Sequence, residues 1–168
     1  IGNSTTCPRD LVNNEDVRLV FTVLAESVAA RLRDYGLKCT GIQISLRDNQ
    51  LYSATRQGLL TKPSYLSADI INKAMELFLA NYNWFHPLRS IGIRAINLVT
   101  EKDHIQLALF DDIDEKTREQ ESLSHTIDAI HSRFGHGSLM RASCLLDSRL
   151  TGFNPKEDHV IHPVGYFK

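Results

Sequence analysis

The chain has 168 residues, of which 42% are hydrophobic and 23% are charged, and its formal net charge is -1 at pH 7. This length suits one domain with an appendage better than two full domains. No apolar run approaches the roughly 20 residues of a membrane helix, and three scattered cysteines without a CxxC pair argue against a disulfide scaffold or a zinc knuckle. The chain begins at Ile1 without a signal sequence, so we expect a piece of a longer protein from a reducing cytoplasm.

Hydrophobic periodicity predicts a helix over about residues 15–35, followed by a hairpin. In the helix, apolar residues recur every three or four positions, and Gly36 follows where a left-handed cap is expected. Strict alternation over 41–47 predicts a half-buried strand. The dipeptide Asp48–Asn49 predicts a tight turn into a returning strand at about 50–60.

A second helix and a last strand follow. Pro63 is expected to end the hairpin, and Ser67 is expected to cap a helix that runs to about residue 82. The last strand is predicted over about 88–98. Its apolar residues change parity along the strand, which predicts a bulge near Arg94–Ala95.

With a short extended piece at 1–6, the order is strand, helix, strand, strand, helix, strand. This order predicts an α+β fold of the split βαβ type, with a four-stranded sheet, two helices on one face and the other face open. We expect this domain to span 1–100 and to carry 11 Lys and Arg against 8 Asp and Glu. A clamp-binding segment and linker at 101–112 and a helical extension at 113–168 complete the predicted organisation. An acidic stretch at 111–121 leads into a third helix that ends at Gly135, with a looser tail behind it.

Three strings carry a family resemblance. The strings at 1–6 (IGNSTT), 23–32 (VLAESVAARL) and 88–93 (LRSIGI) resemble, in order and spacing, the little finger domain of Y-family translesion DNA polymerases of the DinB and UmuC type. The resemblance covers residues 1 to about 110. It implies a DNA-binding domain of an error-prone polymerase, polymerase IV-like or polymerase V-like, that acts in DNA damage tolerance.

In that family the open sheet face holds the phosphate backbone of primer-template DNA and positions it without reading bases. Arg47 is added to the implied contacts from strand alternation alone. The predicted DNA-binding residues are Ser4, Thr5, Thr6, Arg47, Arg56, Arg89, Ser90 and Arg94.

Residues 106–110 (QLALF) resemble the peptide with which bacterial polymerases bind the sliding clamp. An extended segment of this kind places apolar anchors in a pocket while a glutamine binds at the rim. The alternative is a buried strand under the extension. The predicted clamp-binding residues are Gln106, Leu107, Leu109 and Phe110.

The chain itself is not expected to catalyse a reaction or to hold a cofactor or metal. In the family, the carboxylates that bind two magnesium ions lie in the palm, and the sequence offers no such constellation. We interpret the acidic run at 111–114 as a partner for the following helix dipole. The expected parent is a bacterial, cytoplasmic, nucleoid-associated DNA polymerase, whose palm, fingers and thumb lie outside this sequence.

Two other classes of binding module share this topology. An RNA-recognition motif stacks bases on aromatic residues of its central strands, and Tyr52 is the one aromatic candidate that this sequence offers there. A metabolite-sensing regulatory domain would pair its sheets in a dimer. Both remain alternatives at this point.

Overall fold

The computed structural model describes residues 1–100 and 115–155. The elements of the domain are β1 (Gly2–Leu11), α1 (Asn14–Asp34), β2 (Leu37–Asp48), β3 (Ser53–Ser64), α2 (Ser67–Asn81) and β4 (Leu88–Thr100). The elements of the extension are α3 (Glu115–Phe134), the 3-10 turns His136–Ser138 and Ala142–Leu146, and α4 (Ser148–Thr151). The predicted split βαβ order is confirmed.

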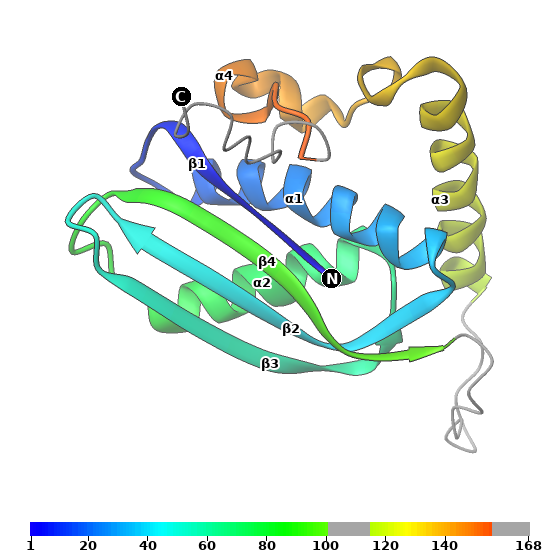
Figure 1. The fold of residues 1–168 in the computed structure, drawn as a ribbon, viewed down its shortest axis with the longest axis horizontal. Helices are drawn as coiled ribbons and strands as arrows, with labels where there is room; N and C mark the ends of the chain where they lie inside the picture. The colour runs from blue at the N-terminus through cyan, green and yellow to red at the C-terminus, as the bar shows by residue number, and fades with distance from the viewer. Residues whose placement is uncertain (101–114, 156–168) are drawn as a thin grey trace, which may run out of the picture.

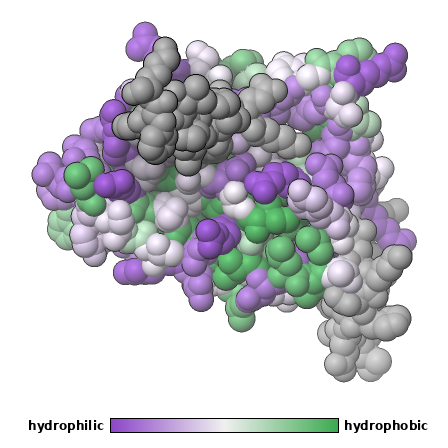
Figure 2. All heavy atoms as spheres, in the orientation of Figure 1, coloured by the Kyte–Doolittle hydropathy of each residue, from purple (hydrophilic) through white to green (hydrophobic). Residues whose placement is uncertain are grey.

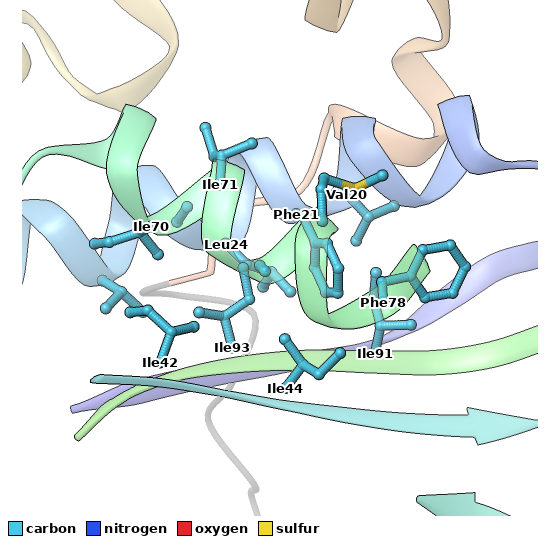
Figure 3. Close-up of a cluster of buried hydrophobic side chains, with 14 of the residues drawn as sticks. Val20, Phe21, Leu24, Ile42, Ile44, Ile70, Ile71, Phe78, Ile91 and Ile93 are labelled. Atoms are coloured by element: carbon cyan, nitrogen blue, oxygen red, sulfur yellow. The ribbon is translucent and has the colours of Figure 1, made fainter. Parts of the chain in front are cut away.

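The four strands form one antiparallel sheet in the order β1-β4-β2-β3, and α1 and α2 lie together on one of its faces (Figure 1). Figure 3 shows the core between these two layers, where isoleucines of β2 and β4 meet apolar side chains of the helices. Phe21 of α1 and Phe78 of α2 contact each other edge to face at 6.5 Å between ring centroids. Among the described residues, no helix lies over the other face of the sheet (Figure 1).

The first helix begins and ends where its sequence dictates. The side chain of Asn13 accepts a hydrogen bond from the backbone N–H of Asp16 at 2.8 Å, which satisfies one of the free donors of the first turn. Gly36 has φ +62°, so the predicted left-handed residue after the helix is confirmed. At the start of α2, by contrast, the cap residue is Leu66, and Ser67 is already helical.

Two details of the β2–β3 hairpin differ from the prediction. The turn has four residues, because the carboxylate of Asp48 accepts hydrogen bonds from the backbone N–H groups of Gln50 and Tyr52, both at 2.9 Å. β3 also continues through Pro63, which was expected to end it. Because β3 is an edge strand, a residue without an N–H can be accommodated there.

The bulge predicted near Arg94 is not at that position. Arg94 and Ala95 pair regularly with β2, and the register shift of β4 lies beside Leu88 instead. The parity of the apolar residues changes because Ile96 lies over Gly41 on the uncovered face, whereas Ile91 and Ile93 belong to the core.

The extension packs back onto the domain in two different ways. Residues 142–153 lie along α1 (Figure 1), and Leu150 is fully buried in the main core, with Phe153 packed against it. Asp147 pairs with Arg9 of β1 at 2.8 Å. No side chain at positions 116–134 of α3 is buried, so this helix is attached by surface contacts.

Candidate nucleic-acid interface

Three rows of polar and small residues cross the uncovered face of the sheet. Paired residues of neighbouring strands point to the same side, and these positions alternate with the buried isoleucines. We call this surface the polar face. Its rows are Thr6–Ser90–Arg47–Ser53, Ser4–Gly92–Ser45–Thr55 and Gly2–Arg94–Gln43–Gln57.

The rows are regularly spaced. Successive rows are two residues apart along each strand, a distance of roughly 7 Å, and neighbouring positions within a row are roughly 4.8 Å apart. A row spacing of this size is similar to the separation of successive phosphates along one nucleic-acid strand. The spacing of the rows therefore matches the spacing of phosphates along such a strand.

Residues of the middle and third rows line a hollow in the polar face. Its volume is about 470 Å³, and its lining includes Ser4, Ser45, Thr55 and Arg94. At Gly92 a Cβ atom would lie 2.6 Å from Oγ of Ser45 and 2.7 Å from Cβ of Ser4. Only a hydrogen fits there, because the side chains of Ser4 and Ser45 pack closely over this point of β4.

Two arginines of the polar face are available for a ligand. Arg47 and Arg94 are exposed, and within the described ranges neither makes a hydrogen bond or an ion pair. Two other predicted contacts are engaged within the protein: Arg89 pairs with Asp10 at 3.1 Å, and Arg56 donates to Asn81 at 3.1 Å.

The structure brings five of the eight predicted DNA-binding residues together. Two of the remaining three lie on the helix side of the sheet, because Thr5 pairs with the buried Ile91, and Arg56 with the buried Ile44. Arg89 stands at the register shift of β4. The five residues on the polar face are Ser4, Thr6, Arg47, Ser90 and Arg94.

The hydroxyl of Ser90 donates a hydrogen bond to the carbonyl oxygen of Thr5 at 2.8 Å, which fixes the Ser90 side chain between β4 and β1.

Several residues of the three rows were not predicted from the sequence. Strand alternation in β2 placed Gln43 and Ser45 on the same face as Arg47, and this signal could have identified both. No equivalent signal identified the others, which are Gly2, Gly92, Thr55, Gln57 and Ser53.

Beyond its third row the uncovered face becomes aliphatic. Ile96, Gly41 and Leu59 form the next row, and the side chain of Leu59 is 66% exposed. Figure 2 shows apolar surface gathered beside polar surface on the side of the molecule turned toward the viewer. The polar character is therefore confined to the three rows.

The predicted clamp-binding segment, Gln106 to Phe110, lies outside the described residues. β4 ends at Thr100 and α3 begins at Glu115, so the segment connects two elements of the structure.

Ionisable groups away from the polar face serve the fold. A hydrogen bond from Arg9 is the largest cause that lowers the pKa of Asp16, and the backbone N–H of Val12 adds to it. Burial raises the pKa of Cys7 and of Cys39 to about 11. Both thiols therefore stay protonated at neutral pH, which makes them poor nucleophiles and metal ligands.

Two other kinds of site were sought in the described ranges, 1–100 and 115–155. No group of three or more His, Cys, Asp or Glu side chains there could hold a metal ion. No helix among these residues is both long and apolar enough to cross a membrane.

The fold is an α+β domain whose antiparallel sheet carries two helices on one face and the polar face on the other. The family model described as the impB/mucB/samB family C-terminal domain matches residues 1–109, and the chain belongs to this family. The resemblance to the little finger domain of DinB and UmuC-type polymerases is thereby confirmed.

Similar proteins match a longer part of the chain than the family model does, including part of the C-terminal extension. The chain is 42% identical over 150 residues to a DNA polymerase IV of Acetivibrio thermocellus, an alignment that covers 89% of this chain and 37% of that protein. It is 31% identical over 147 residues to a DNA polymerase IV of Clostridium acetobutylicum, covering 86% and 36%. The chain thus spans little more than a third of the length of these relatives.

A solved structure described as a complex of the beta-clamp processivity factor and the little finger domain of PolIV matches 66% of this chain and 97% of that chain. The TM-score is 0.48 at 18% identity, so this match adds nothing to the family assignment.

Proposed function

We propose that this chain is the DNA-gripping domain of an error-prone translesion DNA polymerase and that its polar face holds the phosphate backbone of primer-template DNA. The observation that carries the proposal is the pair Arg47 and Arg94, exposed on the polar face without a partner in the described part of the chain. They lie in the first and third rows, and Arg94 lines the hollow.

The chemistry of the rows suits a backbone ligand. Arginines neutralise phosphates, and hydroxyls and backbone N–H groups donate to phosphate oxygens, none of which reads a base sequence. A polymerase needs this kind of contact because it must advance along any sequence. The positions of the rows hold no aromatic ring, which disfavours the stacking mode of an RNA-recognition motif.

The segment Gln106 to Phe110 is proposed to bind the sliding clamp. Its support is the residue pattern, a glutamine followed by apolar anchors, and its place directly after β4. Leu109 and Phe110 would fill an apolar pocket of the clamp, and Gln106 would bind at its rim.

The remainder of the parent protein is proposed to supply nucleotidyl transfer. The relatives are almost three times longer than the matched region, which leaves room for a palm with magnesium-binding carboxylates, fingers and a thumb. This proposal places the protein in the bacterial cytoplasm, in contact with the nucleoid.

DNA binding is tested with the full 168-residue chain and a fluorescent duplex of about 20 base pairs, whose anisotropy reports binding. Hydrogen bonds to charged groups contribute roughly 1.5–3 kcal/mol each, so the double variant Arg47→Ala/Arg94→Ala should weaken binding at least about tenfold. The control Arg18→Ala/Arg149→Ala removes the same charge from exposed positions on α1 and α4. Equal weakening by the two variants would refute the proposed face.

Clamp binding is tested separately by calorimetry with a purified bacterial sliding clamp. The wild type should bind, and Leu109→Ala/Phe110→Ala should abolish the heat of binding. A double variant that binds as tightly as the wild type would show that this segment is not the anchor.

A further inference from the structure

α3 crosses the end of the domain where α1, β2 and β3 meet (Figure 1), and basic side chains of these three elements contact it. Arg33 comes from the last turn of α1, Lys38 from the start of β2 and Lys62 from the end of β3. The ring of Tyr65 lies beside Arg33 and Lys38. We call these four residues the basic cradle.

The carboxylates that pair with the cradle belong to α3. Asp128 receives two hydrogen bonds from Arg33, from Nε at 2.5 Å and from Nη2 at 2.8 Å. Glu121 pairs with Lys38 at 3.0 Å. The two parallel bonds of Arg33 form the geometry with which arginine binds carboxylate and phosphate alike.

An aromatic ring completes the cradle. Nζ of Lys38 lies 4.8 Å from the centroid of the Tyr65 ring, and Cζ of Arg33 lies 5.8 Å from it. On the α3 side, the ring of His125 contacts the same tyrosine edge to face at 5.9 Å. Cations around an aromatic ring are the groups with which proteins hold single strands, since phosphates pair with the cations and bases stack on the ring.

Departure of α3 would uncover Tyr65, which is 4% exposed, but would remove no buried side chain at positions 116–134 of α3 itself. The contacts of α3 with the cradle include two ion pairs, a ring contact, a hydrogen bond from Lys62 to Thr117 at 3.2 Å and one between the Tyr65 hydroxyl and His125 at 3.4 Å. The described side chains of α3 are not buried. Residues 142–153 are anchored independently by the buried Leu150. Binding of a polyanion in place of α3 therefore replaces the charge contacts of Asp128 and Glu121 by others.

We propose that the basic cradle is a second nucleic-acid site, specific for the backbone of single-stranded DNA, and that α3 occupies it with carboxylates in place of phosphates. In the free chain, Asp128 and Glu121 compete with the strand for Arg33 and Lys38. The cradle consists of residues outside the polar face, so this site goes beyond the duplex-binding role proposed above.

The test uses the full chain, a labelled oligothymidine of about 12 nucleotides and fluorescence anisotropy. All proteins carry Arg47→Ala/Arg94→Ala, so that the polar face does not contribute. Removing the competing charges with Glu121→Gln/Asp128→Asn should tighten binding by about fivefold or more, and adding Lys38→Ala/Lys62→Ala should abolish the gain.

A matched control separates release of the cradle from a change in net charge. Glu15→Gln/Glu119→Gln removes two exposed carboxylates that lie on α1 and on α3. This control should change affinity less than twofold. Equal affinities of the two double variants, or a gain that survives Lys38→Ala/Lys62→Ala, would overturn the proposal. Failure of the polar face to bind duplex DNA would appear in the duplex experiment with the wild type. It would not affect this comparison, in which every protein lacks Arg47 and Arg94, so the two failures are distinguishable.

Discussion

Gly92 should be intolerant of any side chain, because it lies at the centre of the polar face between two serines. In Gly92→Ala the new Cβ would stand 2.6 Å from Oγ of Ser45 and 2.7 Å from Cβ of Ser4, both well inside van der Waals contact. The hydroxyl of Ser45 can rotate away, but the Cβ of Ser4 is fixed to its strand. Overpacking of this kind costs about 1–3 kcal/mol, so β1 must shift from β4.

Thermal and urea unfolding of Gly92→Ala measure this cost. A loss of about 1–3 kcal/mol lowers the Tm of a chain of this size by roughly 2–12 °C. Gly137→Ala is the control, because nothing lies within 4 Å of its Cβ position and it should stay within about 0.5 kcal/mol of the wild type. Ser4→Gly should recover part of the loss in the double variant. A Gly92→Ala protein as stable as the control would refute the close packing of the middle row.

Two further predictions concern ionisable groups. Arg9 lowers the pKa of Asp16 below its ordinary value of 3.8, so the pair stabilises the fold above about pH 4 and loses its effect as pH falls through the lowered value. Asp16→Asn should therefore lower the free energy of unfolding at about pH 6, and the difference from the wild type should shrink in acid; a difference independent of pH would contradict this. Burial raises the pKa of Cys7 and Cys39 to about 11 and also raises that of Cys144. A thiol reagent at about pH 8 should label them slowly in the native protein and at once in denaturant, whereas fast native labelling would contradict the burial.

Local signals made most of the fold predictable. The spacing of apolar residues in α1 and the glycine after it predicted the extent of that helix. The alternation in β2 predicted which face of the sheet carries Arg47. The hairpin turn is longer than the dipeptide Asp48–Asn49 that was predicted. It is longer because the carboxylate of Asp48 accepts hydrogen bonds from the backbone N–H groups of Gln50 and Tyr52. Pro63 was taken as a strand end because the sequence does not reveal which strand lies at the edge of the sheet.

Contacts between distant residues could not be predicted in this way. Arg33 and Asp128 are 95 positions apart, and no periodicity links them. Likewise, the pattern of β3 did not show that Arg56 points toward α2 while Thr55 joins the polar face. The residues of the polar face were thus predictable on β2, where polar and apolar residues alternate strictly. Those on the edge strand β3 were not predictable.

The dependence of duplex binding on salt tests the central claim most directly. Each phosphate that a protein neutralises contributes a slope of about -0.9 to log K against log salt concentration. We predict that Arg47→Ala/Arg94→Ala makes this slope shallower by about 2, and that two duplexes of unrelated sequence bind the wild type equally. An unchanged slope, or strong preference for one sequence, would contradict a face that holds the DNA backbone.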